Sequence, residues 1–243
     1  MNNEYKINHK IKYSEVDNNY FLRLDHIFTH FQDITGDHSN EMEIDSDTMK
    51  RLSNAFWVIS RMKIKIHSIP EFEQTVTVET WPTFAKGVRF GRDYTITCGG
   101  KPLVSCSSEW CTLDCDTNRP RKVETVHYPH DMPHRTDRSD AGEFLPIAET
   151  IDQTDYHHTH KVRFTDIDTN KHANNLSYLR MTLDCFALDE LHEDTIDQVQ
   201  INYAMQTYFG DEIALYKKKT DVGYYVEGVY NGQTAFRCVI ICK

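Results

Sequence analysis

The segment His160-Lys161-Val162-Arg163-Phe164-Thr165-Asp166-Ile167-Asp168-Thr169-Asn170 is a second copy of His9-Lys10-Ile11-Lys12-Tyr13-Ser14-Glu15-Val16-Asp17-Asn18-Asn19, at an offset of 160 − 9 = 151 residues. Nearly every pair of matched positions is an identity or a conservative exchange. Both copies alternate apolar with polar residues as far as Tyr13 and Phe164, which is the period of a half-buried strand. The sequence therefore predicts a duplicated unit that opens with a strand and a polar turn.

A helical pattern follows each copy of the repeat. Apolar residues recur at steps of three and four, as Leu24, Ile27, Phe28, Phe31 and Ile34 in the first half and as Leu176, Leu179, Leu183 and Phe186 in the second. This spacing places the apolar side chains on one face of a helix. Either Asn174 or Asn175 suits the N-cap position of the second helix.

Strand-like runs follow each helix. In the first half they span residues 57–66, 75–81, 88–98 and 103–113, and in the second half residues 196–203, 212–217, 224–230 and 234–242. Gly99-Gly100 and Asn231-Gly232 separate the last two runs of each half and are two-residue hairpin signals. We therefore expect an α+β fold of two tandem units, each with a long helix packed on a curved antiparallel sheet.

The region between the halves is typical of a surface linker. Residues 120 to 157 contain many charges without apolar periodicity, and they hold four of the seven prolines, Pro120, Pro129, Pro133 and Pro146. We expect an N-terminal domain over residues 1–125, a linker over 126–156 and a C-terminal domain over 157–243.

Composition narrows the class of protein. The chain has 243 residues, 39% of them hydrophobic, and a net charge of −10, which excludes wholesale disorder and argues against nucleic acid as a partner. It has neither an apolar run of about 18 residues nor a signal-peptide pattern at its start, so no membrane association is expected. The seven cysteines are odd in number and form no CxxC pair, which favours reduced thiols and a cytoplasmic location.

The two turns that close the repeat differ in side chains. The second turn contains Asp168, Asn170 and His172, spaced by two just before a helix, whereas the first has Phe21 in the position of His172. A carboxylate, an amide and an imidazole beside a helix N-terminus could stabilise a developing oxyanion. Asp and Asn are also common turn formers, and Asp17 repeats Asp168, so a structural role for Asp168 stays open.

These residues carry a resemblance to a known family. The segment from Arg163 to Leu179 resembles the signature of acyl-acyl carrier protein (acyl-ACP) thioesterases, an Asp-x-Asn-x-His followed by x-Asn-Asn and an aromatic residue. The segments Trp57 to Met62, Ser107 to Trp110 and Thr117 to Arg121 resemble further segments of that family. The resemblance is to its bacterial members with tandem domains, and it covers nearly the whole chain.

The resemblance implies two tandem hotdog domains and hydrolysis of the thioester that links a fatty acyl chain to acyl carrier protein, which ends chain elongation. It implies no metal and no organic cofactor. Asp168, Asn170 and His172 match the family's catalytic turn, but the family's glutamate and cysteine are here Gln206 and Thr207. The neutral amide of Gln206 can orient water but accepts no proton. We therefore expect His172 to act as the base or to donate a hydrogen bond to the thioester oxygen. Asn170 and Gln206 are expected to orient water and substrate.

Basic clusters are candidates for docking the acidic carrier, because a chain of charge −10 repels it on average. The candidates are Lys171, the group Arg119, Arg121 and Lys122, and the run Lys217, Lys218 and Lys219. The tract His157-His158-Thr159-His160 is interpreted as surface histidines rather than as a metal site, because it lacks cysteines or carboxylates at ligand spacing.

Two other functions stay open: an acyl-CoA thioesterase, and a non-catalytic module that binds acyl thioesters because Gln206 has silenced the site. The tandem repeat already supplies inside one chain the paired interface that a single hotdog domain obtains by dimerising, and a homodimer of the whole chain stays open as well.

Overall fold

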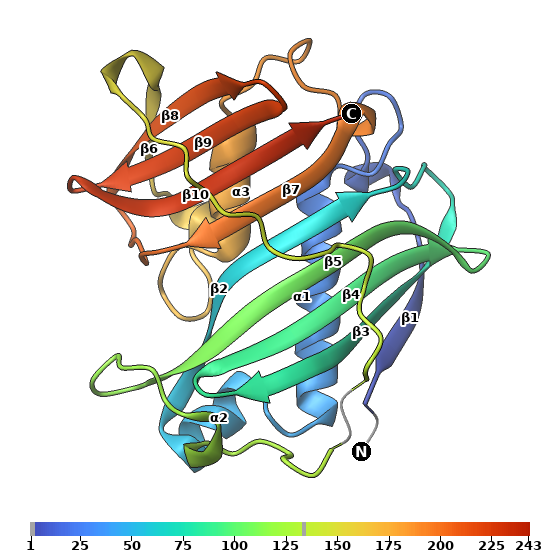
Figure 1. Cartoon of the computed structure of the whole chain (residues 1–243), viewed down its shortest axis with the longest axis vertical. Coiled ribbons are helices and arrows are strands. Elements are labelled where there is room, and N and C mark those ends of the chain that lie inside the picture. Colours follow the sequence, from blue (N-terminus) through green and yellow to red (C-terminus); the bar gives the residue numbers. More distant parts are fainter. Residues whose placement is uncertain (1–2, 133–134) are drawn as a thin grey trace. The chain divides into compact units, whose positions relative to one another are not determined.

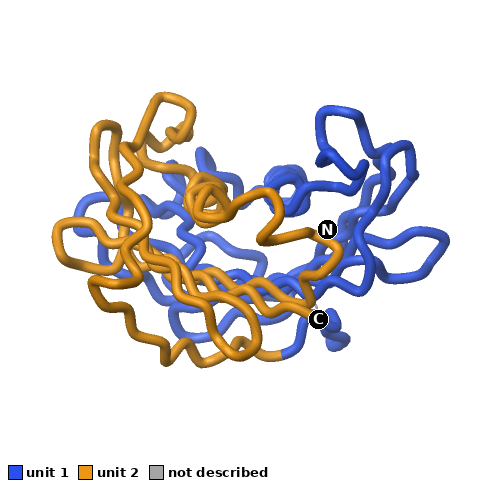
Figure 2. Tube along the Cα trace, turned by 90° about the horizontal axis from the view of Figure 1, so that it is seen from above, with its two compact units in different colours: residues 1–142 blue, residues 143–243 orange. Residues whose placement is uncertain are grey.

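The structure, a computed structural model, describes residues 3–132 and 135–243 and divides into two compact units, residues 1–142 and 143–243 (Figure 2). Of the residues expected to form the linker, those up to Gly142 belong to the first unit and the rest to the second. Pro133, which was part of that expectation, lies outside the described residues, as do Met1 and Asn2 at the start of the chain.

The first unit packs a long helix on an antiparallel sheet (Figure 1). Its elements are β1 (Tyr5–Lys10), the 3-10 helix η1 (Tyr13–Glu15), α1 (Leu24–Glu41), α2 (Ser46–Ser53), β2 (Ala55–Ile66), β3 (Thr75–Lys86), β4 (Arg89–Cys98), β5 (Lys101–Asp114) and the 3-10 helix η2 (Val123–Thr125). The strand order is β1-β3-β4-β5-β2, and α1 contacts β1 and β3.

The second unit repeats this architecture with a shorter helix (Figure 1). Its elements are η3 (Gln153–Asp155), β6 (Tyr156–Lys161), η4 (Phe164–Asp166), α3 (Asn175–Leu183), η5 (Glu193–Thr195), β7 (Ile196–Tyr203), β8 (Glu212–Thr220), β9 (Gly223–Tyr230) and β10 (Gln233–Cys242). The strand order is β7-β10-β9-β8-β6, and α3 contacts β9 and β10. The predicted α+β fold of two tandem units is therefore confirmed, but the second unit has a helix of nine residues rather than the long helix that was expected.

Local chemistry explains why these elements form where the sequence predicts them. Both hairpins have two central residues with positive φ, Gly99 and Gly100 at +56° and +81° and Asn231 and Gly232 at +49° and +74°, as a type I′ turn requires. The predicted apolar stripe of α1 is buried along its whole length. Among the described residues, every helix is too short or too polar to cross a membrane.

The N-cap and the last residue of α3 differ in part from the sequence-based expectation. The Asn174 side chain accepts a hydrogen bond from the Leu176 N–H at 2.9 Å, so Asn174 rather than Asn175 is the N-cap. The helix ends at Leu183, so Phe186 lies beyond it, and its ring packs against the ring of Tyr224 with centroids 4.9 Å apart. The expectation that Phe186 belongs to the helix was therefore wrong, although its apolar contact is real.

The opening strands end earlier than the alternation of residues predicts. β1 stops at Lys10 and β6 at Lys161, and the next residues turn into η1 and η4. The Glu15 carboxylate accepts a hydrogen bond from the Lys12 N–H at 2.6 Å. In the second unit the Asp166 carboxylate accepts the matching bond from the Arg163 N–H at 2.7 Å. These bonds close each turn and leave Tyr13 and Phe164 on the surface, so these two positions were wrongly interpreted as strand.

Helix α2 is the element that the periodicity did not predict. Its N-cap Asp45 accepts hydrogen bonds from the N–H groups of Asp47 and Thr48 at 3.0 Å each, and Asn54 ends it in the left-handed conformation. With eight residues it is too short to show an apolar stripe. Its signal was therefore in the caps rather than in the periodicity.

Candidate active site

The turn from Asp168 to His172 joins β6 and η4 to the start of α3. The Asp168 N–H donates to the His172 carbonyl at 3.0 Å, and the Lys171 N–H donates to the Asp168 carbonyl at 3.0 Å. Lys171 has a φ of +67°, and Ile167 and Ala173 close the base of the turn as an isolated antiparallel bridge. The backbone therefore fixes the positions from which the predicted catalytic side chains project.

Asp168 has two separate contacts in this turn. One carboxylate oxygen, Oδ1, accepts the Asn170 N–H at 2.7 Å, and the other, Oδ2, lies 3.7 Å from Nδ1 of His172. The two side chains retain only 18% and 16% exposure, so they face each other in a largely desolvated place. Asp168 thus both closes the turn and lies next to the imidazole.

The surroundings of His172 determine which ring nitrogen carries the proton. Its Nδ1 faces two oxygen acceptors, the Ala173 carbonyl at 3.3 Å and the Asp168 carboxylate at 3.7 Å. Neither oxygen can donate, so the proton of the neutral ring belongs on Nδ1. This tautomer leaves a lone pair on Nε2, which is the state required of a general base.

A second segment of the unit, residues 204–207, is held against this turn. The Ala173 N–H donates to the Thr207 carbonyl at 2.8 Å, directly after His172 in the chain. On the other side, the N–H groups of Ala204 and Met205 donate to the Ala235 carbonyl at the start of β10, at 2.9 and 3.1 Å. Gln206, which is half-buried, lies between these fixed points.

Tyr178 on α3 anchors both neighbours of Gln206. Its hydroxyl donates to the Met205 carbonyl at 3.2 Å, accepts the Thr207 N–H at 3.0 Å, and lies 3.0 Å from Thr207 Oγ1. Burial raises the pKa of Tyr178, so the phenol stays protonated as a donor. No role was predicted for Tyr178. The signal in the sequence is a hydroxyl-bearing residue at the position where the first copy of the repeat has the apolar Ile27.

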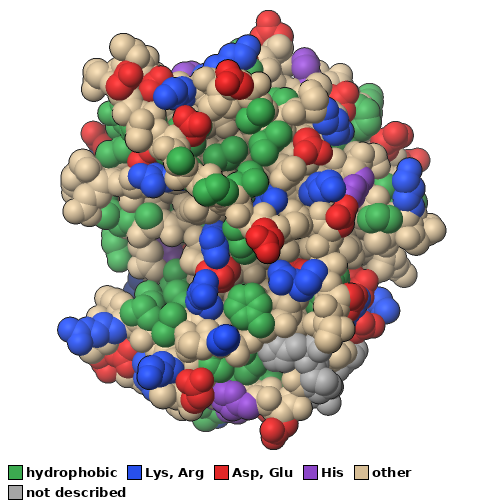
Figure 3. All heavy atoms as spheres, viewed as in Figure 1, with side chains coloured by type: hydrophobic (Ala, Val, Ile, Leu, Met, Phe, Trp, Pro, Cys, Tyr) green, Lys and Arg blue, Asp and Glu red, His purple; other side chains and the backbone are tan. Residues whose placement is uncertain are grey.

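The basic residues expected to dock a carrier differ in how their charges are engaged. They are exposed or half-exposed: Arg119, Arg121 and Lys122 follow β5 in the first unit, and Lys171, Lys217, Lys218 and Lys219 lie in the second. Arg121 pairs with Asp114 at 3.1 Å, and Lys217 pairs with Glu190 at 2.7 Å. On the face shown in Figure 3, basic side chains lie among acidic ones. Of these candidates, Lys171 belongs to the candidate catalytic turn itself.

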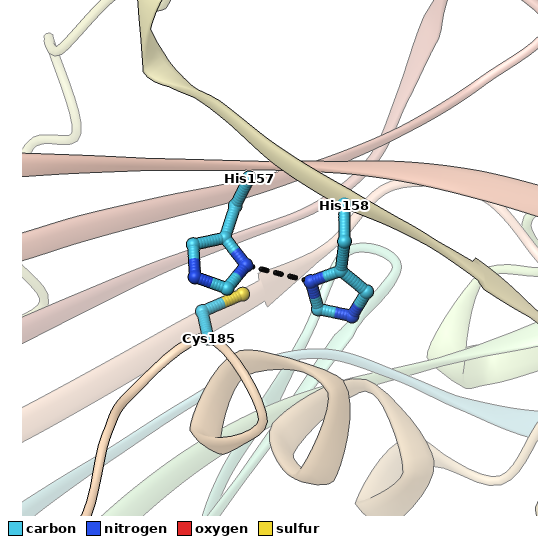
Figure 4. Close-up of side chains that lie close together, drawn as sticks. All are labelled: His157, His158 and Cys185. Carbon is cyan, nitrogen blue, oxygen red and sulfur yellow. Dashed lines mark hydrogen bonds between the residues drawn. The ribbon is translucent and has the colours of Figure 1, made fainter.

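The histidine tract is divided between two different environments. His160 pairs with Asp166 at 2.9 Å, whereas His157 and His158 bring their Nδ1 atoms within 2.7 Å of each other beside the thiol of Cys185 (Figure 4). A register shift between Tyr156 and His158 in the pairing of β6 with β8 places the two neighbouring rings together. Cys185 was not predicted to lie beside the tract, because it follows α3 and is far from residues 157–160 in the sequence.

Both halves of the chain match models of one family. Residues 2–128 match the acyl-ACP thioesterase N-terminal domain, and residues 149–239 match the acyl-ACP thioesterase C-terminal domain. The chain is 22% identical over 225 residues to an oleoyl-acyl carrier protein thioesterase, chloroplastic, of Coriandrum sativum, in a match that covers 86% of this chain and 61% of the relative. An acyl-[acyl-carrier-protein] hydrolase of Cuphea viscosissima is 24% identical over 190 residues, which is 73% of this chain and 45% of the relative. The chain thus spans 61% and 45% of the lengths of these plant relatives.

Solved structures share the fold over the full length. An acyl-ACP thioesterase from Bacteroides thetaiotaomicron superposes with a TM-score of 0.85 at 22% identity, covering 99% of this chain and 98% of the other. A 12:0-ACP thioesterase from Umbellularia californica gives a TM-score of 0.84 at 16% identity, covering 100% and 98%. At such identities the likeness establishes the shared fold of both units.

Proposed function

The chain belongs to the acyl-ACP thioesterase family, and from that membership we propose that it hydrolyses the thioester of fatty acyl-ACP. The products are a free fatty acid and holo-ACP, and their release ends fatty acid chain elongation. The observation that carries the proposal is the turn from Asp168 to His172, in which Nδ1 of the imidazole faces two oxygen acceptors and Nε2 keeps its lone pair. An unprotonated imidazole nitrogen can act as a general base that activates water for attack on a thioester.

The proposed reaction assigns a role to each residue of the turn. His172 Nε2 takes a proton from water as its oxygen attacks the thioester carbonyl carbon. The tetrahedral intermediate then collapses, the carbon–sulfur bond breaks, and the imidazolium returns the proton to the leaving phosphopantetheine sulfur. Asp168 stabilises the transient positive charge on His172, and Asn170 and the N-terminal end of α3 offer donors for the oxyanion.

Gln206 takes the place where the family has a glutamate, and the structure supports a positioning role for it. The amide carbonyl can accept a hydrogen bond from the attacking water, but it takes no proton at neutral pH. Its backbone neighbours are held by Tyr178 and by the Ala173 N–H. With Thr207 in the cysteine position and its hydroxyl bonded to Tyr178, direct attack by water is favoured over a thiol nucleophile.

Thiol release from a panel of acyl-ACP and acyl-CoA substrates of different chain lengths tests the proposal, with the His172→Ala variant in parallel. We expect turnover on acyl-ACP that collapses in the variant. Faster turnover on acyl-CoA would instead identify an acyl-CoA thioesterase. Tight binding of acyl-ACP without turnover would identify a non-catalytic module and would mean that the exchange of glutamate for Gln206 silenced the site.

We propose Lys171, with Arg119, Arg121, Lys122, Lys217, Lys218 and Lys219 as further candidates, for docking of the carrier. Lys171 is exposed and directly precedes His172, so a phosphopantetheine arm that reaches the turn would bring the acidic carrier close to it. If this is correct, kcat/KM on acyl-ACP should fall as ionic strength rises, and Lys171→Glu should remove part of that dependence. A flat response in the unmodified protein would contradict electrostatic docking.

The proposed reaction takes place in the cytoplasm. The seven cysteines are unpaired within the described residues, which suits a reducing compartment. Acyl carrier protein is the partner that the reaction requires; it requires neither nucleic acid, a membrane nor a second copy of the chain.

A further inference from the structure

Three chemically reactive side chains converge in the first unit, the unit that lacks the candidate catalytic turn. His9 comes from β1, Glu15 from η1 and His30 from α1. The Nε2 atom of His9 lies 3.0 Å from Oε1 and 2.9 Å from Oε2 of Glu15, and Nε2 of His30 lies 3.6 Å from Oε1. The two imidazole rings have centroids 4.5 Å apart, so two nitrogens and a carboxylate oxygen face one small space.

Part of this cluster belongs to the repeat and has a structural explanation. The pair of His9 and Glu15 recurs in the second unit as His160 and Asp166, at 2.9 Å. In both units the carboxylate also closes the 3-10 turn by accepting a backbone N–H. These two residues would therefore be expected whether or not the first unit binds anything.

His30 is the residue that the repeat does not explain. The matching position in α3 is Met181, which is buried in the second unit and needs no polar partner. The His30 side chain is 9% exposed, and its Nε2 has no hydrogen-bond partner among the described residues. A buried polar atom without a partner costs on the order of 1–3 kcal/mol, so an imidazole here calls for a function that methionine cannot provide.

Histidine binds a metal ion through the lone pair of an unprotonated ring nitrogen. An ion at this place would therefore replace the proton between His9 Nε2 and the Glu15 carboxylate, which lie 2.9–3.0 Å apart.

We propose that His9, Glu15 and His30 bind a divalent transition-metal ion of the zinc type, with the fourth position left to water. Zinc binds histidine nitrogen and carboxylate oxygen at about 2.0–2.2 Å in a tetrahedron, which needs ligand atoms roughly 3.3 Å apart. The two separations from Glu15 Oε1, 3.0 Å to His9 Nε2 and 3.6 Å to His30 Nε2, bracket that value, and the three ligand atoms all lie within 4.8 Å of one another. The ion would join β1, η1 and α1, and so would stabilise the first unit independently of the proposed reaction. The family resemblance implied no metal anywhere in the chain, and the only tract of the sequence weighed as a metal site was residues 157–160, so the proposed site departs from that expectation.

Zinc titration of the metal-free, full-length protein by calorimetry tests this site, with His30→Met as the decisive variant. Methionine stands at the matching position of the second unit, so the variant should fold. We expect one zinc ion per chain and a loss of affinity of about 100-fold or more in His30→Met, since even partners of metal ligands contribute about 10- to 100-fold. His30→Gln replaces it if His30→Met misfolds.

Cys185→Ser is the matched control, because His157, His158 and Cys185 form the second cluster that zinc could occupy within residues 3–132 and 135–243. This variant should bind zinc like the unmodified protein, and zinc should raise the Tm of both but not of His30→Met. Cobalt bound at the proposed site should lack the sulfur-to-metal charge-transfer band of a thiolate ligand. Unchanged zinc affinity in His30→Met, loss of binding in Cys185→Ser, or no stoichiometric binding at all would each overturn the proposal.

Discussion

The turn from Asp17 to Phe21 in the first unit and the turn from Asp168 to His172 in the second have the same backbone and different chemistry. In both, the first N–H donates to the last carbonyl, at 2.8 and 3.0 Å, and the Asp side chain accepts the N–H two positions later, at 2.8 and 2.7 Å. Tyr20 and Lys171 both have positive φ, at 66° and 67°. The Asp carboxylate therefore serves the turn itself, with or without catalysis.

What differs is the last side chain and its neighbour. The first unit has Phe21 where the second has His172. The Leu22 N–H donates to the Pro70 carbonyl at 2.8 Å, and the equivalent Ala173 N–H donates to the Thr207 carbonyl at 2.8 Å. Pro70 therefore corresponds to Thr207, and the preceding residue, Ile69, corresponds to Gln206. The apolar residues Phe21 and Ile69 of the first unit thus correspond in position to the polar residues His172 and Gln206 of the second, and the proposed chemistry rests on the polar residues.

Replacing His172 by phenylalanine turns the second turn into a copy of the first and should have the largest effect. We expect kcat for thiol release to fall by about 100-fold or more, because the general base is lost. Tm should change little, since phenylalanine already occupies this turn in the first unit. The reverse change, Phe21→His, should leave kcat unaltered. A His172→Phe variant that keeps most of its kcat would show that the difference between the turns is not catalytic.

Tyr178→Phe tests the support beneath Gln206, at a position where the first unit has Ile27. The change leaves the buried Thr207 N–H and hydroxyl without their partner, so the free energy of unfolding should fall by about 2 kcal/mol. The segment around Gln206 should also loosen and lower kcat several-fold with little change in KM. Denaturant unfolding and steady-state kinetics measure the two effects. A stability loss with an unaltered kcat would make Tyr178 purely structural.

Gln206→Ile copies the first unit at the other polar position. We expect kcat to fall about tenfold, because the amide that orients water is lost while His172 is retained. Gln206→Glu is the opposite probe: a carboxylate with an ordinary pKa of about 4.3 is ionised at neutral pH and can accept a proton, so kcat should rise. Steady-state kinetics measure kcat for both variants. Equal kcat values in Gln206→Ile and Gln206→Glu would mean that Gln206 has no part in the mechanism.

Most of the fold was predictable because it depends on local patterns. The stripe from Leu24 to Ile34 and the hairpin at Asn231-Gly232 each depend on residues a few positions apart, and both were confirmed. The repeat at an offset of 151 residues was confirmed by matching turn bonds, and it was visible because each copy is a short continuous segment. The ends of the opening strands were missed, because the carboxylate of Glu15 closes a turn that apolar periodicity does not report.

The candidate site was predictable in part, for a related reason. Asp168, Asn170 and His172 lie within five consecutive residues, so their proximity follows from their spacing in the sequence. The anchoring of residues 205–207 by Tyr178, and the approach of Cys185 to His157, join segments that are distant in the chain. Only the packing of α3 brings these groups together, and no spacing rule in the sequence encodes that packing.

The helix that follows each turn provides the smallest test. α1 has 18 residues, and among the described residues Arg23 gives it no side-chain cap, whereas α3 has nine residues and is capped by Asn174. A short helix depends more on its ends, so Asn174→Ala should lower the free energy of unfolding by about 1 kcal/mol. Asn175→Ala is the matched control and should cost less than about 0.5 kcal/mol.

Urea unfolding followed by far-UV circular dichroism measures the free energy of unfolding of both variants. Trp57, Trp81 and Trp110 all lie in the first unit, so their fluorescence reports whether that unit is affected. Equal losses in the two variants would mean that the cap contributes nothing particular to the second unit.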